Sequence, residues 1–253
     1  MTDPAKPPAH PRTGDLRTYG RRRGRPLRPE RARLVEELLP RIRVPAAVLA
    51  ARPASIDPRS LFDRTVNAVW LELGFGGGEH LAAQAKARPD VGFIGCEPFE
   101  NGVASLLRRV DAEELANVRI LPDDGRPLLA ALADASLDRV FILFPDPWPK
   151  TRHQRRRLVS PATLDGLARL IVDGGFLRLA TDDPIYAGAM AELSASHAGF
   201  RLAAGGLGAP GWQPTDAPSS RYEEKARRAG RVPVFFELER RPRAAMAAGL
   251  ASR

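Results

Sequence analysis

The chain has 253 residues, 43% of them apolar, and carries a formal net charge of +9. This length and apolar content support one large or two small folded domains and exclude wholesale disorder. The single cysteine, Cys96, excludes an intrachain disulfide framework, and no apolar run reaches the ~18 residues that a membrane-spanning helix needs.

The positive charge is gathered in three segments. Residues 1–33 carry a net charge of +7, residues 150–157 of +5 and residues 221–243 of +4, which leaves −7 for the rest. Of the 39 basic residues 35 are arginines, which suit bidentate phosphate contacts, although a GC-rich coding bias would also favour arginine. Clustered charge favours a polyanionic partner through counterion release, so we expect a nucleic acid.

The first third of the chain contains little regular periodicity. Residues 1–27 are rich in Pro, Gly and Arg and predict a mobile basic arm. Residues 28–58 predict a helix over 30–43 followed by a linker over 45–58. We expect the folded domain over 59–241 and a tail over 242–253. The first ten residues lack the apolar segment of a secretory signal, which together with the cysteine count predicts a cytoplasmic protein.

From residue 68 onward, strand-like and helical segments alternate. The expected strands cover 68–73, 91–96, 118–121, 137–144, 175–180, 200–203 and 234–239, and the expected helices cover 78–88, 99–114, 127–134, 161–172 and 184–196. Such alternation predicts an α/β fold, a mostly parallel seven-stranded sheet with helices on both faces. The last two strands have no helix between them, so we expect them to pair antiparallel at the edge.

A glycine-rich turn follows the first strand, with the sequence Glu-Leu-Gly-Phe-Gly-Gly-Gly over 72–78. Gly74, Gly76 and Gly78 allow positive φ angles and close approach of a ligand at the carboxyl end of the strand. The dinucleotide-binding pattern would need a third glycine where Glu79 stands, and that carboxylate would oppose a pyrophosphate at the helix N-terminus. The turn therefore predicts a ligand without phosphate at this point, with Glu72 placed to receive a cationic group.

Acidic residues also follow the second and third strands. A carboxylate at Glu97 can accept both hydroxyls of a ribose, and Asp124 lies where an adenine amino group is expected. For Glu97 alone, a solvated helix cap is the alternative. Glycines, a cation-receiving Glu72, a ribose-binding Glu97 and an adenine-side Asp124 together describe S-adenosylmethionine.

The fourth strand runs into Phe-Pro-Asp-Pro-Trp-Pro-Lys-Thr-Arg-His-Gln-Arg-Arg-Arg over 144–157. Its three prolines stiffen the loop and remove backbone donors, so that Asp146 is held in place. Trp148 can stack on a base, a contact worth about 1–3 kcal/mol in single-stranded nucleic acids. The basic run can hold phosphates, while a solvated helix face is the alternative for Arg155–Arg157 taken alone.

These segments, with Thr181-Asp182 after the fifth strand and the late Ser-Arg-Tyr-Glu over 220–223, resemble the bacterial tRNA (guanine-N7-)-methyltransferases over residues 60–240. The resemblance implies a Rossmann-like class I fold and methyl transfer from S-adenosylmethionine to N7 of a tRNA guanosine, guanine 46 of the variable loop. The implied donor site comprises Glu72, Gly74, Gly76, Gly78, Glu97, Asp124 and Asp146. The implied guanosine site comprises Lys150, Asp182, Ser220, Arg221, Tyr222 and Glu223. The chain departs from the family at Ser220 and Ala226, where Thr and Gly are usual.

Guanine N7 carries a lone pair and no proton, so its methylation requires in-line alignment and no general base. The product ring gains positive charge, which a fixed carboxylate would stabilise, and Asp146 is the candidate catalytic residue. Asp182 and Glu223 would accept the N1–H and amino protons of guanine and so reject adenine. We expect no metal cofactor, tRNA as the partner, no membrane contact, no obligatory protein partner, and a monomer or homodimer.

Three alternatives remain at this stage. Exocyclic-amino methyltransferases resemble an Asp-Pro-Pro-aromatic pattern after the same strand, but here Trp148 takes the third position and a basic run follows. A non-catalytic RNA-binding protein would not need Glu72, Glu97 and all the glycines. An NAD-dependent oxidoreductase is disfavoured by Glu79 and by the lack of a hydride-site constellation of Lys, Tyr or His.

Overall fold

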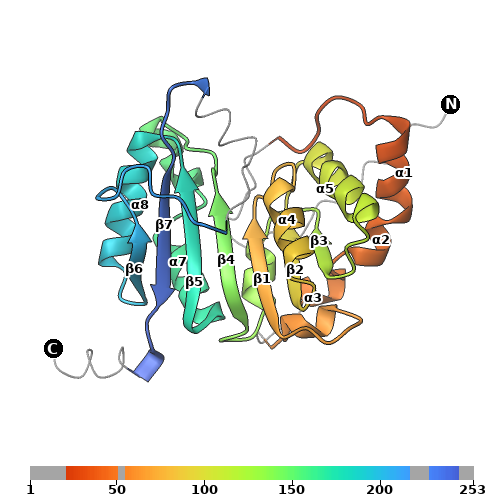
Figure 1. Cartoon of the computed structure of the whole chain (residues 1–253), viewed down its shortest axis with the longest axis horizontal. Helices are drawn as coiled ribbons and strands as arrows, with labels where there is room; N and C mark the ends of the chain where they lie inside the picture. Colours follow the sequence, from red (N-terminus) through yellow and green to blue (C-terminus); the bar gives the residue numbers. More distant parts are fainter. Residues whose placement is uncertain (1–20, 51–54, 217–227, 245–253) are drawn as a thin grey trace.

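Seven strands form one sheet in a computed structural model of the chain, which describes residues 21–50, 55–216 and 228–244 (Figure 1). The strands are β1 (Ala68–Leu73), β2 (Val91–Cys96), β3 (Val118–Leu121), β4 (Leu137–Leu143), β5 (Ile171–Thr181), β6 (Phe200–Gly205) and β7 (Val234–Arg240), and their spatial order is β3-β2-β1-β4-β5-β7-β6. Strands β1 to β5 pair in parallel, and β7 is antiparallel to both β5 and β6. The predicted mostly parallel sheet with an antiparallel pair at its edge is confirmed.

The two late strands differ in how deeply they are buried. Strand β7 inserts beside β5 and is largely buried, whereas β6 at the sheet edge leaves three consecutive side chains exposed. An edge strand has one solvent-facing flank, and Arg201, Leu202 and Ala203 of β6 are exposed, although β7 carries more charged residues than β6 does.

Helices cover both faces of the sheet. On one face Leu71 joins a core with α3 (Ala46–Ala50), α6 (Arg126–Ala131), α7 (Pro161–Leu170) and α8 (Pro184–Ser196). On the other, Phe93 joins a core with α1 (Pro29–Glu37), α2 (Leu39–Ile42), α4 (Glu79–Ala87) and α5 (Glu100–Ala112). Strand β2 is buried at all of its positions, as expected for a strand that helices cover on both faces. None of the described helices is long and apolar enough to span a membrane.

The region before β1 is more ordered than the sequence indicated. The helix predicted over 30–43 is broken into α1 and α2 near Leu38, because Pro40 has no N–H to continue the helical hydrogen bonds. The predicted linker over 45–58 contains α3, whose Val48 is buried in the core, and a 3₁₀ helix η1 (Pro58–Leu61) begins at its end.

Of the predicted arm over 1–27, the structure describes residues 21–27. The Arg22 carbonyl accepts the Glu100 N–H at 2.9 Å, and the Asn101 side chain bonds the backbones of Gly24 and Arg25, each at 2.9 Å. The described end of the arm therefore lies against the start of α5. Residues 1–20 lie outside the described residues, and the mobility of the arm stays a prediction.

The helix predicted over 127–134 ends at Ala131, and the predicted boundaries next to β5 also differ from those observed. The helix predicted over 161–172 ends at Leu170, and β5 begins at Ile171, earlier than the predicted 175. The early start is accommodated by Gly174, with φ of +77°, and by a shift of register against β4 between Leu137 and Arg139. The basic run after β4 forms a 3₁₀ helix, η2 (Thr151–Arg156).

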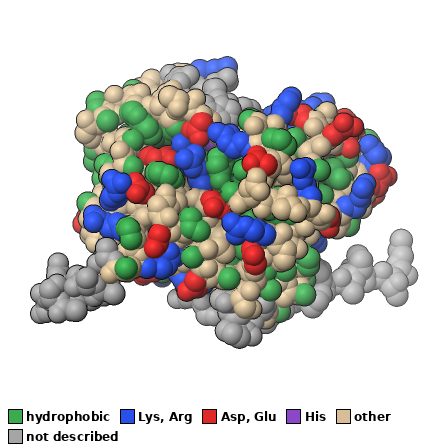
Figure 2. All heavy atoms as spheres, turned by 60° about the horizontal axis from the view of Figure 1, so that its bottom comes forward, with side chains coloured by type: hydrophobic (Ala, Val, Ile, Leu, Met, Phe, Trp, Pro, Cys, Tyr) green, Lys and Arg blue, Asp and Glu red, His purple; other side chains and the backbone are tan. Residues whose placement is uncertain are grey.

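Figure 2 brings the bottom of Figure 1 forward, the side away from the arrowheads of the parallel strands. Basic and acidic side chains are interspersed over this face. The described part of this face offers no one-sign surface to a polyanion, which directs attention to the opposite end of the sheet.

Candidate active site

A cavity of about 350 Å³ opens at the carboxyl ends of β1 to β4. The strand order reverses between β1 and β4, since β2 and β3 lie on one side of β1 and β4 on the other. Ligands of open α/β sheets bind in the crevice outside such a reversal. The lining residues come from the loops after all four strands and include Gly74, Glu97, Asp124 and Asp146.

The glycine turn after β1 has the backbone that its sequence predicts. Gly74, Gly76 and Gly78 have φ of 75°, 56° and 74°, a region that favours glycine. A Cβ atom on Gly78 would also lie 2.7 Å from the Leu106 side chain, so the start of α4 packs closely on α5. Gly74 and Gly76 line the cavity, whereas Gly78 forms the N-cap of α4.

The carboxylate of Glu97 is buried and held by backbone donors. One oxygen accepts the Gly76 N–H at 2.8 Å and the other accepts the Phe99 N–H at 2.9 Å. Burial raises the pKa of Glu97 above its usual value and the two N–H donors lower it, while the charges of Asp146 and Glu72 raise it further. Each oxygen keeps a lone pair for a ligand, which suits the two hydroxyls of a ribose.

Glu72 has a partner within the protein. Its Oε2 atom lies 2.7 Å from Nδ1 of His80, and both side chains are buried. The His80 ring packs on Phe141 with ring centroids 4.6 Å apart. Glu72 is not one of the described residues that line the cavity, so its contact with a cationic group stays a prediction. Sequence analysis missed His80, although its position in the first turn of α4 was visible.

Two arginines hold the acidic pair after β3. Arg126 donates to the Asp124 carboxylate through its backbone N–H at 3.0 Å and through Nε at 2.9 Å. Arg22 of the N-terminal arm forms an ion pair with Asp123. Asp123 and Asp124 both line the cavity, and neither arginine was singled out from the sequence.

The loop after β4 brings Asp146 to the cavity, where its side chain is exposed. Phe144 and Trp148 flank this segment with φ of 52° and 42°, values that non-glycine residues seldom adopt. Such strain persists only when the surroundings impose it, and it is concentrated at functional sites. Lys150 is the exposed N-cap residue of η2, and it is not among the described residues that line the cavity.

Asp182 lies at a second cavity of about 300 Å³, whose lining includes Leu207, Arg231 and Val232. Its Oδ2 atom is 3.0 Å from the Arg231 guanidinium. Asp183 is the N-cap of α8, since its carboxylate accepts the Tyr186 N–H at 2.8 Å. The cap of α8 is therefore Asp183 and not Asp182. The remaining predicted guanosine-site residues lie outside the described residues, and these are Ser220, Arg221, Tyr222 and Glu223. Ala226 lies outside them as well.

Comparison with known proteins places this chain in a family. Residues 66–235 match a family model described as a putative methyltransferase. The tRNA (guanine-N(7)-)-methyltransferase of Rhodospirillum rubrum is 49% identical over 235 residues, which cover 92% of this chain and 91% of that protein. The enzyme of the same name from Paramagnetospirillum magneticum is 52% identical over 230 residues, covering 90% and 94%. This chain belongs to the tRNA (guanine-N7-)-methyltransferase family. The resemblance inferred from the glycine turn and the segment over 144–157 is confirmed.

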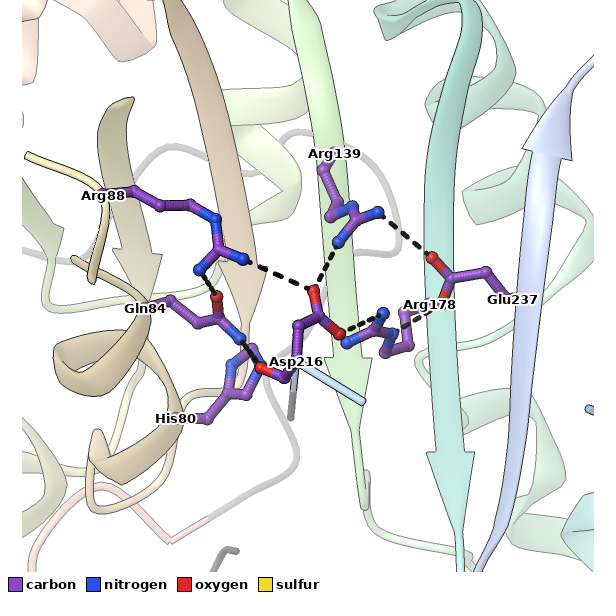
Figure 3. Close-up of polar contacts among 7 residues, drawn as sticks. All are labelled: His80, Gln84, Arg88, Arg139, Arg178, Asp216 and Glu237. Atoms are coloured by element: carbon purple, nitrogen blue, oxygen red, sulfur yellow. Dashed lines mark hydrogen bonds and ion pairs between the residues drawn. The ribbon is translucent and has the colours of Figure 1, made fainter. Parts of the chain in front are cut away.

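In this family member, a cluster of largely buried charges lies on the sheet face beside α4 (Figure 3). Asp216, in the loop after β6, accepts from Arg139 of β4 and from Arg178 of β5, each at 2.9 Å. Arg88 approaches the same carboxylate at 3.8 Å, and the Gln84 side chain donates to the Asp216 carbonyl at 2.6 Å.

Glu237 of β7 closes this cluster. It binds Arg178 at 2.6 Å and Arg139 at 3.4 Å, so these two arginines each lie between two carboxylates. Burial raises the pKa of Asp216, but the Arg178 and Arg139 charges outweigh it and hold that pKa below its usual value. The cluster fixes the loop that leads from β6 towards residues 217–227, and sequence analysis did not foresee it.

We predict that replacing the Asp216 carboxylate destabilises the domain. Removing one partner of a buried pair costs about 3–5 kcal/mol, and we expect about 2 kcal/mol for Asp216→Asn because roughly a quarter of its side chain is exposed. The folded-state pKa is lowered, so this stabilisation is present above the unfolded-state pKa and is lost as the pH falls below about 4. Urea unfolding at pH 7 and pH 3 tests this. Asp111→Asn on the exposed surface of α5 is the control, and equal stability of both variants at pH 7 would contradict the prediction.

We also predict that donor affinity depends on the ionisation of Glu97. Protonation of the carboxylate removes an acceptor for the ribose hydroxyls. Because the pKa of Glu97 is raised above the ordinary value of 4.5, the affinity for S-adenosylmethionine should begin to fall at a pH above 4.5 as the solution is acidified. Glu97→Ala should weaken binding by about 1.5–3 kcal/mol at pH 7.5, the usual loss for a hydrogen bond to a charged group. Calorimetry between pH 5 and 8 measures both effects. A pH profile for Glu97→Gln that matches the wild type would remove Glu97 as the source.

Proposed function

We propose that this chain transfers the methyl group of S-adenosylmethionine to N7 of a guanosine in tRNA, with guanine 46 of the variable loop as the target that the family implies. The observation that carries the proposal is the meeting of the glycine turn, Glu97, Asp124 and Asp146 in one cavity at the strand-order reversal. The names of the relatives, at 49% and 52% identity over nearly the full chain, support the same reaction.

The cavity residues fit the adenosyl part of the donor. Glu97 presents two oriented oxygens for the ribose, and the Asp124 carboxylate, held by Arg126, offers an acceptor to the adenine amino group. Gly74 and Gly76 leave room for close approach of the ligand to the backbone. When bound, S-adenosylmethionine supplies an electrophilic methyl carbon attached to a sulfonium.

Asp146 stands where the incoming base would meet the donor. The guanine ring becomes cationic as N7 is methylated, and a carboxylate fixed beside it stabilises that charge electrostatically. No proton leaves N7, so Asp146 has no proton to remove. Its part is to orient the reactants and to favour the developing charge.

Asp182 is a proposed acceptor for the N1–H and amino edge of guanine, together with Glu223, which lies outside the described residues. Its carboxylate pairs with Arg231 at 3.0 Å, so guanine would share or displace that guanidinium. Adenine, with an acceptor at N1, would face an acceptor and be rejected. Arg21 and Arg156 line the donor cavity and, with exposed Lys150, offer positive charge to the RNA backbone.

The reaction is tested by incubating the full chain with S-adenosylmethionine and bulk tRNA, then identifying the modified nucleosides by mass spectrometry. We expect 7-methylguanosine. A product methylated on an exocyclic amine, or no methylated nucleoside, would overturn the proposed function.

We predict that Asp146→Ala abolishes detectable methyl transfer and that Asp146→Asn, which keeps the shape and loses the charge, lowers kcat by about 10²–10³-fold, the range seen when one electrostatic contact to a transition state is removed. The side chain is exposed in a loop, so the free energy of unfolding should change little. Single-turnover kinetics together with thermal unfolding measure both quantities. Near-wild-type turnover of the folded Ala variant would remove Asp146 from the mechanism.

A further inference from the structure

The last arginine of the basic run points into the protein. The Nε atom of Arg157 donates to the Pro147 carbonyl at 2.9 Å, and its guanidinium lies 4.7 Å from the centre of the Tyr186 ring. Arg155, two residues earlier in the chain, is exposed, whereas Arg157 is only partly exposed. Two arginines that look alike in the sequence therefore have different surroundings.

Tyr186 gives Arg157 a rigid, neutral platform. Its side chain is fully buried in α8, and its hydroxyl accepts the Val159 N–H at 3.0 Å. Burial raises the pKa of its hydroxyl to about 12, so Tyr186 is neutral at neutral pH. A planar guanidinium can lie on such a ring and donate from its edge at the same time, which a lysine ammonium cannot do.

The loop that Arg157 contacts has few backbone donors and a strained backbone. Its prolines at 145, 147 and 149 have no N–H, and Phe144 and Trp148 adopt left-handed backbone angles that cost about 1–3 kcal/mol each. The Phe144 end is fixed by its N–H bond to the Ala180 carbonyl at 2.8 Å and by ring contact with Phe235. At the Trp148 end, Arg157 holds the Pro147 carbonyl.

We propose that Arg157 is a positioning residue for Asp146, acting through the carbonyl of the residue that follows Asp146 in the chain. The tie fixes the Pro147 peptide against α8 and thereby fixes the place of the Asp146 carboxylate at the donor cavity. This inference rests on the proposed function, in which Asp146 favours the charge that develops on the guanine ring. It separates Arg157 from the exposed Arg155, which serves as the comparison for a contact with a tRNA phosphate.

The two roles predict different kinetics. Loss of a phosphate contact weakens tRNA binding and reduces the slope of log affinity against log salt by about 0.7–0.9 per contact. Loss of a positioning contact leaves that slope unchanged and lowers kcat, since a misplacement of about 1 Å costs about 100-fold in rate.

The experiment compares Arg157→Met, Arg157→Lys and Arg155→Ala in the full chain, at saturating S-adenosylmethionine and with tRNA titrated at several salt concentrations. The methionine stem still covers the Tyr186 ring, so the domain should stay folded. We expect Arg157→Met to lower kcat by about 10–100-fold with an unchanged salt slope. Arg157→Lys should regain part of kcat, and Arg155→Ala should raise the tRNA KM with kcat unchanged.

Wild-type kcat for Arg157→Met, or a reduced salt slope matching that of Arg155→Ala, would overturn the positioning role. Should Arg157→Met fail to unfold cooperatively, Arg157→Lys alone decides: reduced kcat with an unchanged slope supports the role, and wild-type kcat overturns it. Failure of the proposed function itself would be seen separately, as absence of 7-methylguanosine with the wild-type chain.

Discussion

Parallel pairing of β1 to β4 is the constraint on which the rest of the structure depends. It brings the carboxyl ends of these strands to one edge of the sheet, and the reversal of strand order beside β1 leaves a crevice there. Residues from four distant parts of the chain therefore meet in that crevice because the pairing of the strands brings their loops together. The helices on both faces are what make a buried parallel sheet possible.

The polar groups of the site are fixed largely through the backbone. Glu97 is oriented by the N–H groups of Gly76 and Phe99, so the glycine turn both makes room for a ligand and aims a carboxylate. The loop after β4 reverses this arrangement, because its prolines lack donors and an arginine side chain supplies one from outside. In both places, a neighbouring donor group holds a segment that carries a carboxylate of the cavity.

The charge cluster around Asp216 uses the same principle at a larger scale. Arg139 and Arg178 rise from the sheet itself, and burying their charges is tolerated because Asp216 and Glu237 lie between them. The cluster ties the loop after β6 to the strands β4 and β5, which also carry Asp146 and Asp182 at their ends. The loop after β6 is thus anchored, through Asp216, to the two strands that precede those carboxylates.

The sequence by itself determined the strand and helix alternation, the antiparallel last pair, the glycine turn and the family, because these depend on local periodicity and on contiguous motifs. Pro40, the cause of the break between α1 and α2, is visible in the sequence, but the packing of α3 is not, since a short helix gains its stability from tertiary contacts. Nor could the sequence tell that Glu72 meets His80, that Arg157 turns inward while Arg155 faces solvent, or that Asp216 gathers three arginines. Each of these depends on which side chains the fold brings within hydrogen-bond reach, and only the tertiary structure decides that.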